Sequence, residues 1–329
     1  RDTSALEQMR NVDVVVFDKT GTLTEGHPTV IGWLWAQGQE EHYKDVLLAA
    51  ESTSDHPLAE AIVTALEGEE QVIPAHLDGF ENITGKGVRV AYQGAEYWVG
   101  SHKLLKDYQA NLSDILADML TQYESDGNSI VYFGRENDLL AVIAIKDQLR
   151  VTSMEAIREL RTQDIEICML TGDGERTASS VAGSLGIMRF VADAMPDDKE
   201  DFIHKLQLQG KTVAMVGDGV NDAQALSCAD VSIAMGKGTD TLMDTAMITL
   251  RTSDLLLLPK VFRLSRQTVS LMYRNLFWAF IYNTVGIFVA AGVLYPVYDI
   301  LLSPALAGAA MALSCVSVAL SSLRLSSRF

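Results

Sequence analysis

The chain has 329 residues, enough for two or three domains with cores of their own, and its net charge of −17 excludes general nucleic-acid binding. The charge is uneven, because residues 255–329 carry six basic side chains and one acidic one, a net +5, which leaves −22 for the rest. Three distant cysteines without metal-finger spacing argue against a disulfide framework and favour a reducing compartment.

The first predicted element is a buried parallel strand that ends at Asp18. Apart from Asp13, residues 12–17 are apolar and mostly β-branched, and Asp18 is followed by Lys19, Thr20 and Gly21. The carboxyl ends of strands in an open α/β sheet are where ligands bind, and a carboxylate there, beside a cation and backbone amides, can attack phosphorus. The alternative is an ordinary N-capping aspartate, which an isolated Asp-x-Thr would favour. The seven-residue string of residues 18–24 favours the nucleophile.

That string, Asp-Lys-Thr-Gly-Thr-Leu-Thr, resembles the phosphorylation motif of P-type ATPases in the haloacid dehalogenase superfamily. Later residues narrow the resemblance, which covers essentially the whole chain, to copper(I)-transporting members of the heavy-metal branch. It implies an α/β fold: a haloacid dehalogenase-like doubly wound parallel sheet, an inserted α+β nucleotide-binding domain and a C-terminal two-helix transmembrane hairpin. The expected parts are phosphorylation (1–25 and 147–254), nucleotide binding (26–146), a basic amphipathic connector (255–274) and membrane helices (275–298 and 300–323).

Within residues 26–146, the candidate nucleotide site lies around two predicted helices. Strands are expected at 29–35, 92–99, 129–133 and 139–145, and helices at 40–51 and from residue 54. His56 precedes Pro57 at a helix start, where a lone histidine is ordinarily an exposed cap residue. A Gly-x-Gly such as 85–87 lets backbone approach a base or a phosphate, a weak signal alone. Together, Glu51, His56, Gly85 and Gly87 resemble the adenine pocket of heavy-metal ATPases, which implies that they bind ATP.

Two further strands of the head also end in polar residues. Residues 165–170 lead into Thr171-Gly172-Asp173, where the threonine hydroxyl and N–H could donate to a phosphoryl oxygen. Residues 212–216 lead into 217–222, where Asp218 and Asp222 among glycines suit Mg²⁺, the alternative being a plain glycine turn. Helices are predicted at 151–163, 175–185 and from 195, and further strands at 190–192, 231–236 and 247–250.

The resemblance also assigns roles in this head. An exposed lysine is usually just solvated, but the superfamily places a lysine where Lys199 stands, paired with the nucleophile's charge. The expected catalytic residues are Asp18, Lys19, Thr20, Thr171, Gly172, Asp173, Lys199 and Asn221. The expected Mg²⁺ ligands are Asp18, the backbone of Thr20, Asp218 and Asp222.

Thr20 separates two reaction classes. Phosphatases of this superfamily have a second aspartate two residues after the nucleophile, acting as acid and then base. Thr20 cannot activate water in this way, so the acyl phosphate should persist, as a pump requires. The alternatives that we keep are a membrane-anchored phosphatase and a non-catalytic metal-sensing membrane protein.

The tail contains two uncharged stretches, residues 275–298 and 300–323, of 24 residues each. About 20 apolar residues suffice to cross a bilayer. Basic residues flank the outer ends and the connecting turn has none, which predicts that both ends and the head are cytoplasmic, at the plasma membrane. A buried hairpin in a soluble protein is the alternative.

Polar and sulfur-containing side chains inside these stretches suggest the transported ion. Tyr282 and Asn283 lie in the first, and Met311, Ser314 and Cys315 in the second, with no charged residue in either. This donor set favours soft monovalent Cu(I), whereas helix packing is the alternative for the small residues. These residues resemble the copper signatures of the family's last two membrane helices, except that Cys315 replaces a serine. Ag(I), or a pump for another soft metal, remains open.

The expected function is therefore ATP-driven export of Cu(I) through an aspartyl phosphate, with ATP and Mg²⁺ as cofactors. The chain starts at Arg1 and lacks the family's actuator domain and Cys-Pro-Cys helix, so we expect a fragment of a longer pump. Expected partners are the lipid bilayer, that missing half and a copper chaperone, and no nucleic acid.

Overall fold

The computed structural model describes residues 3–36, 40–54, 56–69, 72–110, 114–218, 222–235 and 246–291, together with 308, 312 and 316–319. The chain divides into two compact units. One comprises Val12–Leu258, and the other comprises Asp2–Asn11 with Pro259–Phe329.

The first unit contains a six-stranded parallel sheet in the order β12-β11-β10-β1-β8-β9. Its strands are β1 (Val14–Asp18), β8 (Glu166–Leu170), β9 (Arg189–Val191), β10 (Val213–Gly217), β11 (Val231–Met235) and β12 (Ile248–Leu250). Because the chain moves outward from β1 to β8 and then to the other side through β10, the strand order reverses beside β1. This reversal is the switch point at which doubly wound sheets bind ligands.

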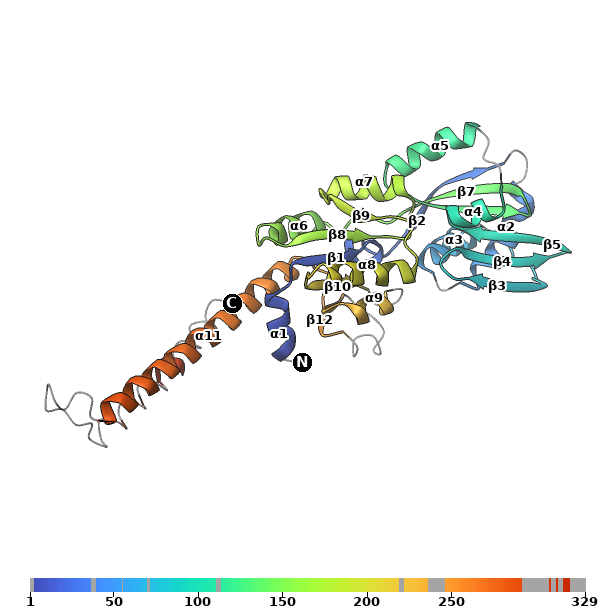
Figure 1. Cartoon of the computed structure of the whole chain (residues 1–329). Helices are drawn as coiled ribbons and strands as arrows, with labels where there is room; N and C mark the ends of the chain where they lie inside the picture. The colour runs from blue at the N-terminus through green and yellow to red at the C-terminus, as the bar shows by residue number, and fades with distance from the viewer. Residues whose placement is uncertain are drawn as a thin grey trace. The chain divides into compact units, whose positions relative to one another are not determined.

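Helices cover both faces of this sheet, as the apolar strand residues require. Figure 1 shows α6 (Ser153–Arg161) and α7 (Glu175–Leu185) on one side of the strands and α8 (Pro196–Leu208) and α9 (Ala223–Cys228) on the other. All residues of β1, β10 and β11 are buried. Val14 and Val16 face a core cluster with Ile203 and Leu206 of α8. The predicted doubly wound sheet is confirmed.

The same unit contains a six-stranded antiparallel sheet in the order β2-β7-β6-β5-β4-β3. Its strands are β2 (Thr29–Trp35), β3 (Gly79–Ile83), β4 (Gly87–Tyr92), β5 (Ala95–Gly100), β6 (Ser129–Arg135) and β7 (Asp138–Lys146). Helices α2 (Glu40–Glu51) and α3 (Pro57–Glu67) pack on one face, beside Val131 and Phe133, whereas α4 (His102–Asp107) and α5 (Asp114–Ser125) pack on the other, beside Tyr132. This alternation is what the two-residue period of a strand produces.

The second unit contains α1 (Thr3–Arg10) packed against α11 (Leu257–Ala290). Ser265 Oγ donates to the Leu6 carbonyl, and the Tyr273 hydroxyl donates to Glu7 Oε1 at 3.2 Å. The Arg10 guanidinium lies 5.3 Å from the centre of the Tyr273 ring. These contacts hold the N-terminal helix to the first half of α11.

The predicted transmembrane hairpin is not shown. Within the described residues, no helix combines the length and the apolar character that a membrane crossing needs. The expected first span is described only as far as residue 291, and most of the second lies outside the described residues.

Candidate active site

The predicted polar residues meet at the carboxyl edge of the parallel sheet. Strand β1 pairs in parallel with β8 and β10, with Asp18 opposite Leu170 and Phe17 opposite Val216. Asp18, at the end of β1, and Thr171, just after β8, therefore lie at one edge, and only 5% and 2% of their surfaces are exposed.

Lys199 bridges two carboxylates at this edge. Its Nζ donates to Asp18 Oδ1 and to Asp222 Oδ1, each at 2.6 Å, and its side chain is buried. Burial alone would lower the pKa of Lys199, but the charges of Asp18 and Asp222 outweigh it, so its pKa is raised. The site thus holds a permanent cation against the carboxylate expected to attack phosphorus.

The arrangement around Asp222 fits Mg²⁺. Asp222 is 1% exposed, and Oδ2 has no hydrogen-bond partner among the described residues. Burial and the neighbouring charge of Asp18 raise the pKa of Asp222 to about 7. A Cβ on Gly21 would lie 2.8 Å from Asp218 Oδ2, and one on Gly217 would lie 2.9 Å from Asp222 Oδ2, so both glycines make room for carboxylate oxygens. Oxygen ligands of this kind suit Mg²⁺.

Lys19 pairs with Asp173. Its buried ammonium forms an ion pair with Asp173 and donates to Ser129 Oγ at 3.0 Å. Thr171 Oγ1 donates to Asp173 Oδ2 at 3.0 Å. Burial raises the pKa of Asp173, but the charge of Lys19 and these hydrogen bonds outweigh it, so the net shift is downward.

The backbone of Thr171 corrects one expectation. Its N–H donates to the Val191 carbonyl at 3.0 Å as part of the sheet, so the hydroxyl alone remains for a phosphoryl oxygen. Asn221 lies outside the described residues, and Gly172 lies near the Ala194 carbonyl, 3.7 Å from its would-be Cβ.

Two residues that the sequence interpretation missed hold the turn after Asp18. Asp147 accepts from the Thr24 hydroxyl and, at 3.1 Å, from the Gly26 N–H. Arg150 donates to the Thr22 carbonyl at 2.9 Å and to the Gly21 carbonyl at 2.7 Å. The only sequence signal was the position of this Asp-x-x-Arg, directly after the last strand of the inserted block.

Two of the four candidate nucleotide residues flank the turn between α2 and α3. Glu51 is 6% exposed, and burial raises its pKa to about 7. His56 caps α3, with Nδ1 accepting from the Leu58 N–H at 3.2 Å. Although His56 is exposed as a residue, desolvation by its neighbours lowers its pKa, and the charges of Asp173 and Asp18 oppose this shift. His56 is therefore within electrostatic reach of the candidate nucleophile.

The two glycines have different surroundings. Gly85, at a φ of +69°, lies in the turn between β3 and β4, and its would-be Cβ would be 2.9 Å from Met195 Cε. Gly87 pairs with Gly100 across β4 and β5, and a Cβ there would be 2.1 Å from the Val99 carbonyl oxygen. The close pairing of the two strands therefore favours glycine at position 87, independently of nucleotide binding.

The candidate copper ligands are only partly described. Tyr282 and Asn283 are exposed on α11, and the Tyr282 ring stacks on Trp278 with centroids 5.8 Å apart. Met311, Ser314 and Cys315 lie outside the described residues.

The sequence is similar to one protein family and to several related proteins. A family model for haloacid dehalogenase-like hydrolases matches residues 12–230. A copper-exporting P-type ATPase of Legionella pneumophila is 42% identical over 325 residues, which cover 99% of this chain and 44% of that protein. A silver-exporting P-type ATPase of Salmonella typhimurium is 43% identical over 330 residues, covering 99% and 40%. The chain thus spans less than half the length of these relatives.

Solved structures of other ATPases also align with this chain. A zinc-transporting PIB-type ATPase in the E2.Pi state aligns with a TM-score of 0.64 and 34% identity, over 98% of this chain and 51% of that one. The catalytic domain of the CPx-ATPase CopB-B aligns with a TM-score of 0.65 and 28% identity, over 80% and 93%.

Proposed function

The chain belongs to the haloacid dehalogenase-like hydrolases and is a homologue of copper-exporting P-type ATPases, and from this premise we propose that it supplies the phosphorylation and nucleotide-binding parts of an ATP-driven Cu(I) exporter. The observation that carries the proposal is the buried Lys199 bridge between Asp18 and Asp222 at the sheet edge.

In this proposal Asp18 attacks the terminal phosphorus of ATP, forming a carboxyl–phosphate bond and releasing ADP. Lys199 holds Oδ1 of Asp18 and offsets the repulsion between the carboxylate and the anionic phosphoryl group. The hydroxyl of Thr171 lies at the same edge. It donates to Asp173 Oδ2 in this structure, and it can donate to a phosphoryl oxygen instead. Mg²⁺, bound by Asp18, Asp218, Asp222 and the Thr20 backbone, would neutralise charge on that group.

The phosphoenzyme should last long enough to be coupled to transport. Thr20 stands two residues after the nucleophile, where an acid would otherwise activate water. Asp147 and Arg150 hold the turn that contains Thr20 and Gly21, which keeps its backbone in place around the acceptor.

We assign the nucleotide to Glu51, His56, Gly85 and Gly87. A lowered pKa keeps the His56 ring neutral at physiological pH, and Nδ1 is occupied by the Leu58 N–H. The proton is then on Nε2, which leaves a donor and a flat ring face for the purine.

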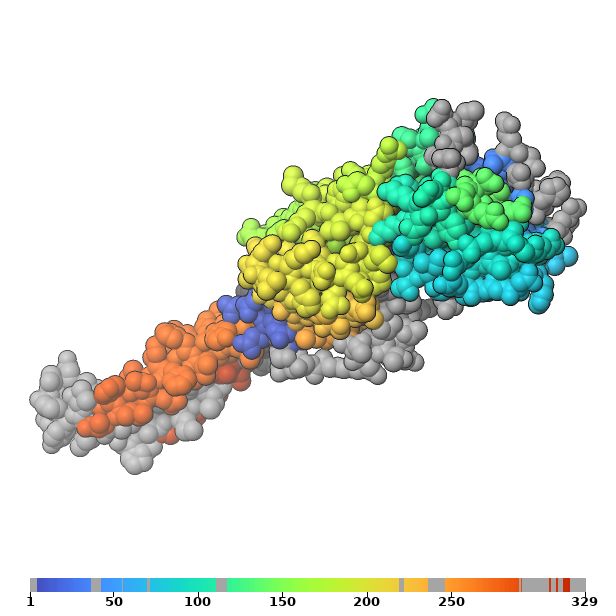
Figure 2. Space-filling view, turned by 45° about the vertical axis from the view of Figure 1, so that its right-hand side comes forward, coloured from blue at the N-terminus to red at the C-terminus, as the bar shows by residue number. Residues whose placement is uncertain are grey.

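We assign residues 275–298 and 300–323 to two membrane helices. Large apolar side chains on the described part of this segment are more than half exposed: Leu276, Phe277, Phe280, Val285, Ile287 and Phe288. In the space-filling view this part of α11, drawn in orange, presents its side chains openly (Figure 2). Many exposed apolar side chains on one helix indicate a membrane or protein contact, and the net +5 of residues 255–329 favours a membrane.

Between these helices, Tyr282, Asn283, Met311, Ser314 and Cys315 would hold Cu(I) in transit at the plasma membrane. The remaining parts of the pump, with an actuator domain and a Cys-Pro-Cys helix, and a copper chaperone would complete the transport system.

The decisive experiment is phosphorylation with radiolabelled ATP, followed by acid quenching. We expect label on the chain, and we expect Asp18→Asn to abolish it while the matched change Asp164→Asn, on an exposed loop, preserves it. Label that survives in Asp18→Asn would contradict the proposal, and rapid hydrolysis of a generic phosphate ester without ATP would favour a phosphatase. Stimulation of the full-length pump by Zn²⁺ but not by Cu(I) or Ag(I) would contradict the metal assignment.

A further inference from the structure

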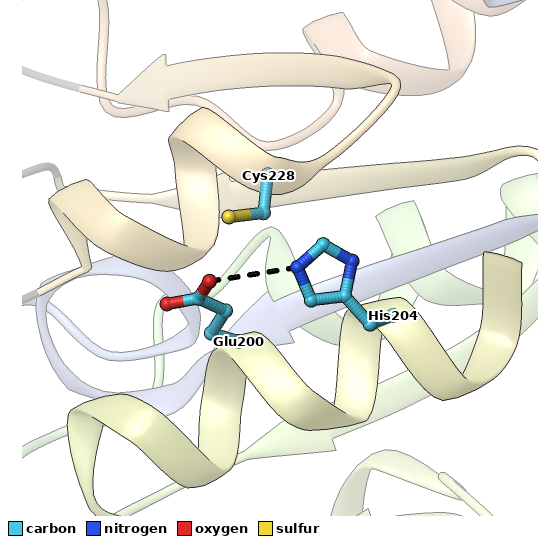
Figure 3. Close-up of side chains that lie close together, drawn as sticks. All are labelled: Glu200, His204 and Cys228. Carbon is cyan, nitrogen blue, oxygen red and sulfur yellow. Dashed lines mark ion pairs between the residues drawn. The ribbon is translucent and has the colours of Figure 1, made fainter.

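Three side chains of types that can bind metals meet between α8 and α9, outside the candidate active site. Glu200 and His204 lie one turn apart on α8, and Cys228 is the last residue of α9 (Figure 3). One ligand atom of each lies within 4.8 Å of the other two, and Glu200 Oε1 is 3.5 Å from His204 Nε2. Glu200 and Cys228 are partly exposed and His204 is exposed, so an ion can reach them from solvent.

Gln207 orients this cluster. Its Nε2 donates to the Cys228 carbonyl at 2.9 Å, so its Oε1 is the atom 3.1 Å from His204 Nδ1 and must accept from it. Nδ1 therefore carries a proton, and Nε2, the nitrogen that lies near Glu200 and Cys228, is the atom that can bind an ion. Histidine ligands of metals are held in this way, with one nitrogen donating to an outer partner and the other facing the ion.

An ordinary explanation accounts for only part of the cluster. An i,i+4 ion pair on a helix surface explains Glu200 and His204. A hydrogen bond between the Cys228 thiol and Glu200 accounts for the third side chain. Neither contact explains why one glutamine bridges both helices there and holds Nδ1 of His204, so that Nε2 faces the other two side chains.

We propose that Glu200, His204 and Cys228 form a Zn²⁺ site, with water or another ligand in the fourth position. A thiolate, an imidazole and a carboxylate are all zinc ligands, and the carboxylate favours Zn²⁺ over softer Cu(I). The bound ion would join α8 to α9. Lys199 immediately precedes Glu200, and Asp222 immediately precedes α9, so the ion would fasten the two helices that begin at the candidate active site.

The test is titration of the metal-free 329-residue chain with Co²⁺ and then Zn²⁺, in excess Mg²⁺ and a metal-free reductant. We expect one equivalent of Co²⁺ to give a thiolate-to-cobalt charge-transfer band that Zn²⁺ removes. Cys228→Ser should abolish the band, and His204→Gln and Glu200→Gln should weaken binding. Gln207→Leu should weaken it by roughly tenfold or more, as loss of a ligand's outer partner does.

Matched controls address the other thiols and imidazoles. Cys168→Ala, which removes the buried thiol of β8, and His76→Gln, a change on an exposed loop, should leave the band and the affinity unchanged. Zn²⁺ should also raise the thermal midpoint of the wild-type chain but not that of His204→Gln, whose circular dichroism should match the wild type. Absence of the band in the wild type, its persistence in Cys228→Ser, or equal affinity in all variants would overturn the proposal.

Discussion

Charge compensation at Asp18 comes from Lys199, 181 positions along the chain, and not from the adjacent lysine. Lys19 is held by Asp173 and Ser129, so its ammonium is committed elsewhere. Lys199 is therefore the cation that faces Asp18 and that would offset the charge of an incoming phosphoryl group.

We expect Lys199→Gln to lower the rate of phosphoenzyme formation by about 10²–10³-fold, the range found when a single preorganised charge-stabilising group is lost. Lys199→Arg should recover part of the rate, because it restores the charge with a different shape. Quenched-flow trapping of labelled protein measures the rate. Lys205→Gln, an exposed change on α8, serves as the control, and an equal rate in Lys199→Gln and Lys205→Gln would refute this role.

Glu51 gives the fold a pH-dependent cost. The pKa of Glu51 is about 7 in the folded chain, against 4.5 for a glutamate in water, so the folded state retains a proton that the unfolded state loses. Below about pH 4.5, Glu51 is protonated in both states and does not lower the free energy of unfolding. Between pH 4.5 and 7 the free energy of unfolding falls as the pH rises, and above pH 7 this loss stays constant at up to about 3 kcal/mol.

We therefore expect Glu51→Gln to be more favourable at about pH 8 than at about pH 5, by up to about 3 kcal/mol of unfolding free energy. Urea unfolding followed by tryptophan fluorescence measures this, because Trp33, Trp35 and Trp98 all lie in the antiparallel sheet. The exposed Glu60→Gln on α3 should show no such pH dependence. A pH-independent effect of Glu51→Gln would rule out the raised pKa.

At the scale of elements, the sequence predicts what has a strong hydrophobic period. Strand β2 matches its predicted bounds, and β1 and β10 are continuous apolar runs that end in aspartate turns. Strand β3 was missed because four of its five residues are exposed, which leaves no alternation to detect. Asp147 and Arg150 were passed over because their partners lie more than a hundred positions away, and no local pattern encodes such contacts.

The β4–β5 pairing offers a test of why Gly87 is glycine. Gly87 and Gly94 both have positive φ, +143° and +76°, but only at Gly87 would a Cβ meet backbone, 2.1 Å from the Val99 carbonyl oxygen. Gly94→Ala should cost about 1–2 kcal/mol of unfolding free energy, from backbone strain alone. Gly87→Ala should cost about 3 kcal/mol or more, because the strands must also separate. Equal losses in urea unfolding would show that the close approach does not constrain this position.

At the scale of the whole chain, charge and apolar surface are segregated. Residues 1–254 have a net charge of −22 and contain both sheets, whereas residues 255–329 have a net +5 and include the exposed apolar side chains of α11. Such a division suits a water-exposed catalytic part joined to a membrane part. The charge asymmetry was readable from the sequence, but the packing of α1 on α11 was not, since it rests on contacts between residues such as Glu7 and Tyr273.

Introducing a charged side chain into α11 tests whether this helix lies in lipid or in water. Placed mid-membrane, the arginine of Val285→Arg should cost about 2.5–3.5 kcal/mol, which reduces insertion of this segment roughly a hundredfold. The segment is sensitive to such a change because Tyr282, Asn283 and Gly286 already weaken its apolar character. Ser270→Arg, on the exposed connector side of the same helix, should leave insertion unchanged. Insertion into microsomal membranes, scored by resistance to alkaline extraction, measures both variants. If Val285→Arg behaves like Ser270→Arg, α11 does not lie in lipid at that position, because an exposed surface substitution in water changes stability by only about 0.5 kcal/mol.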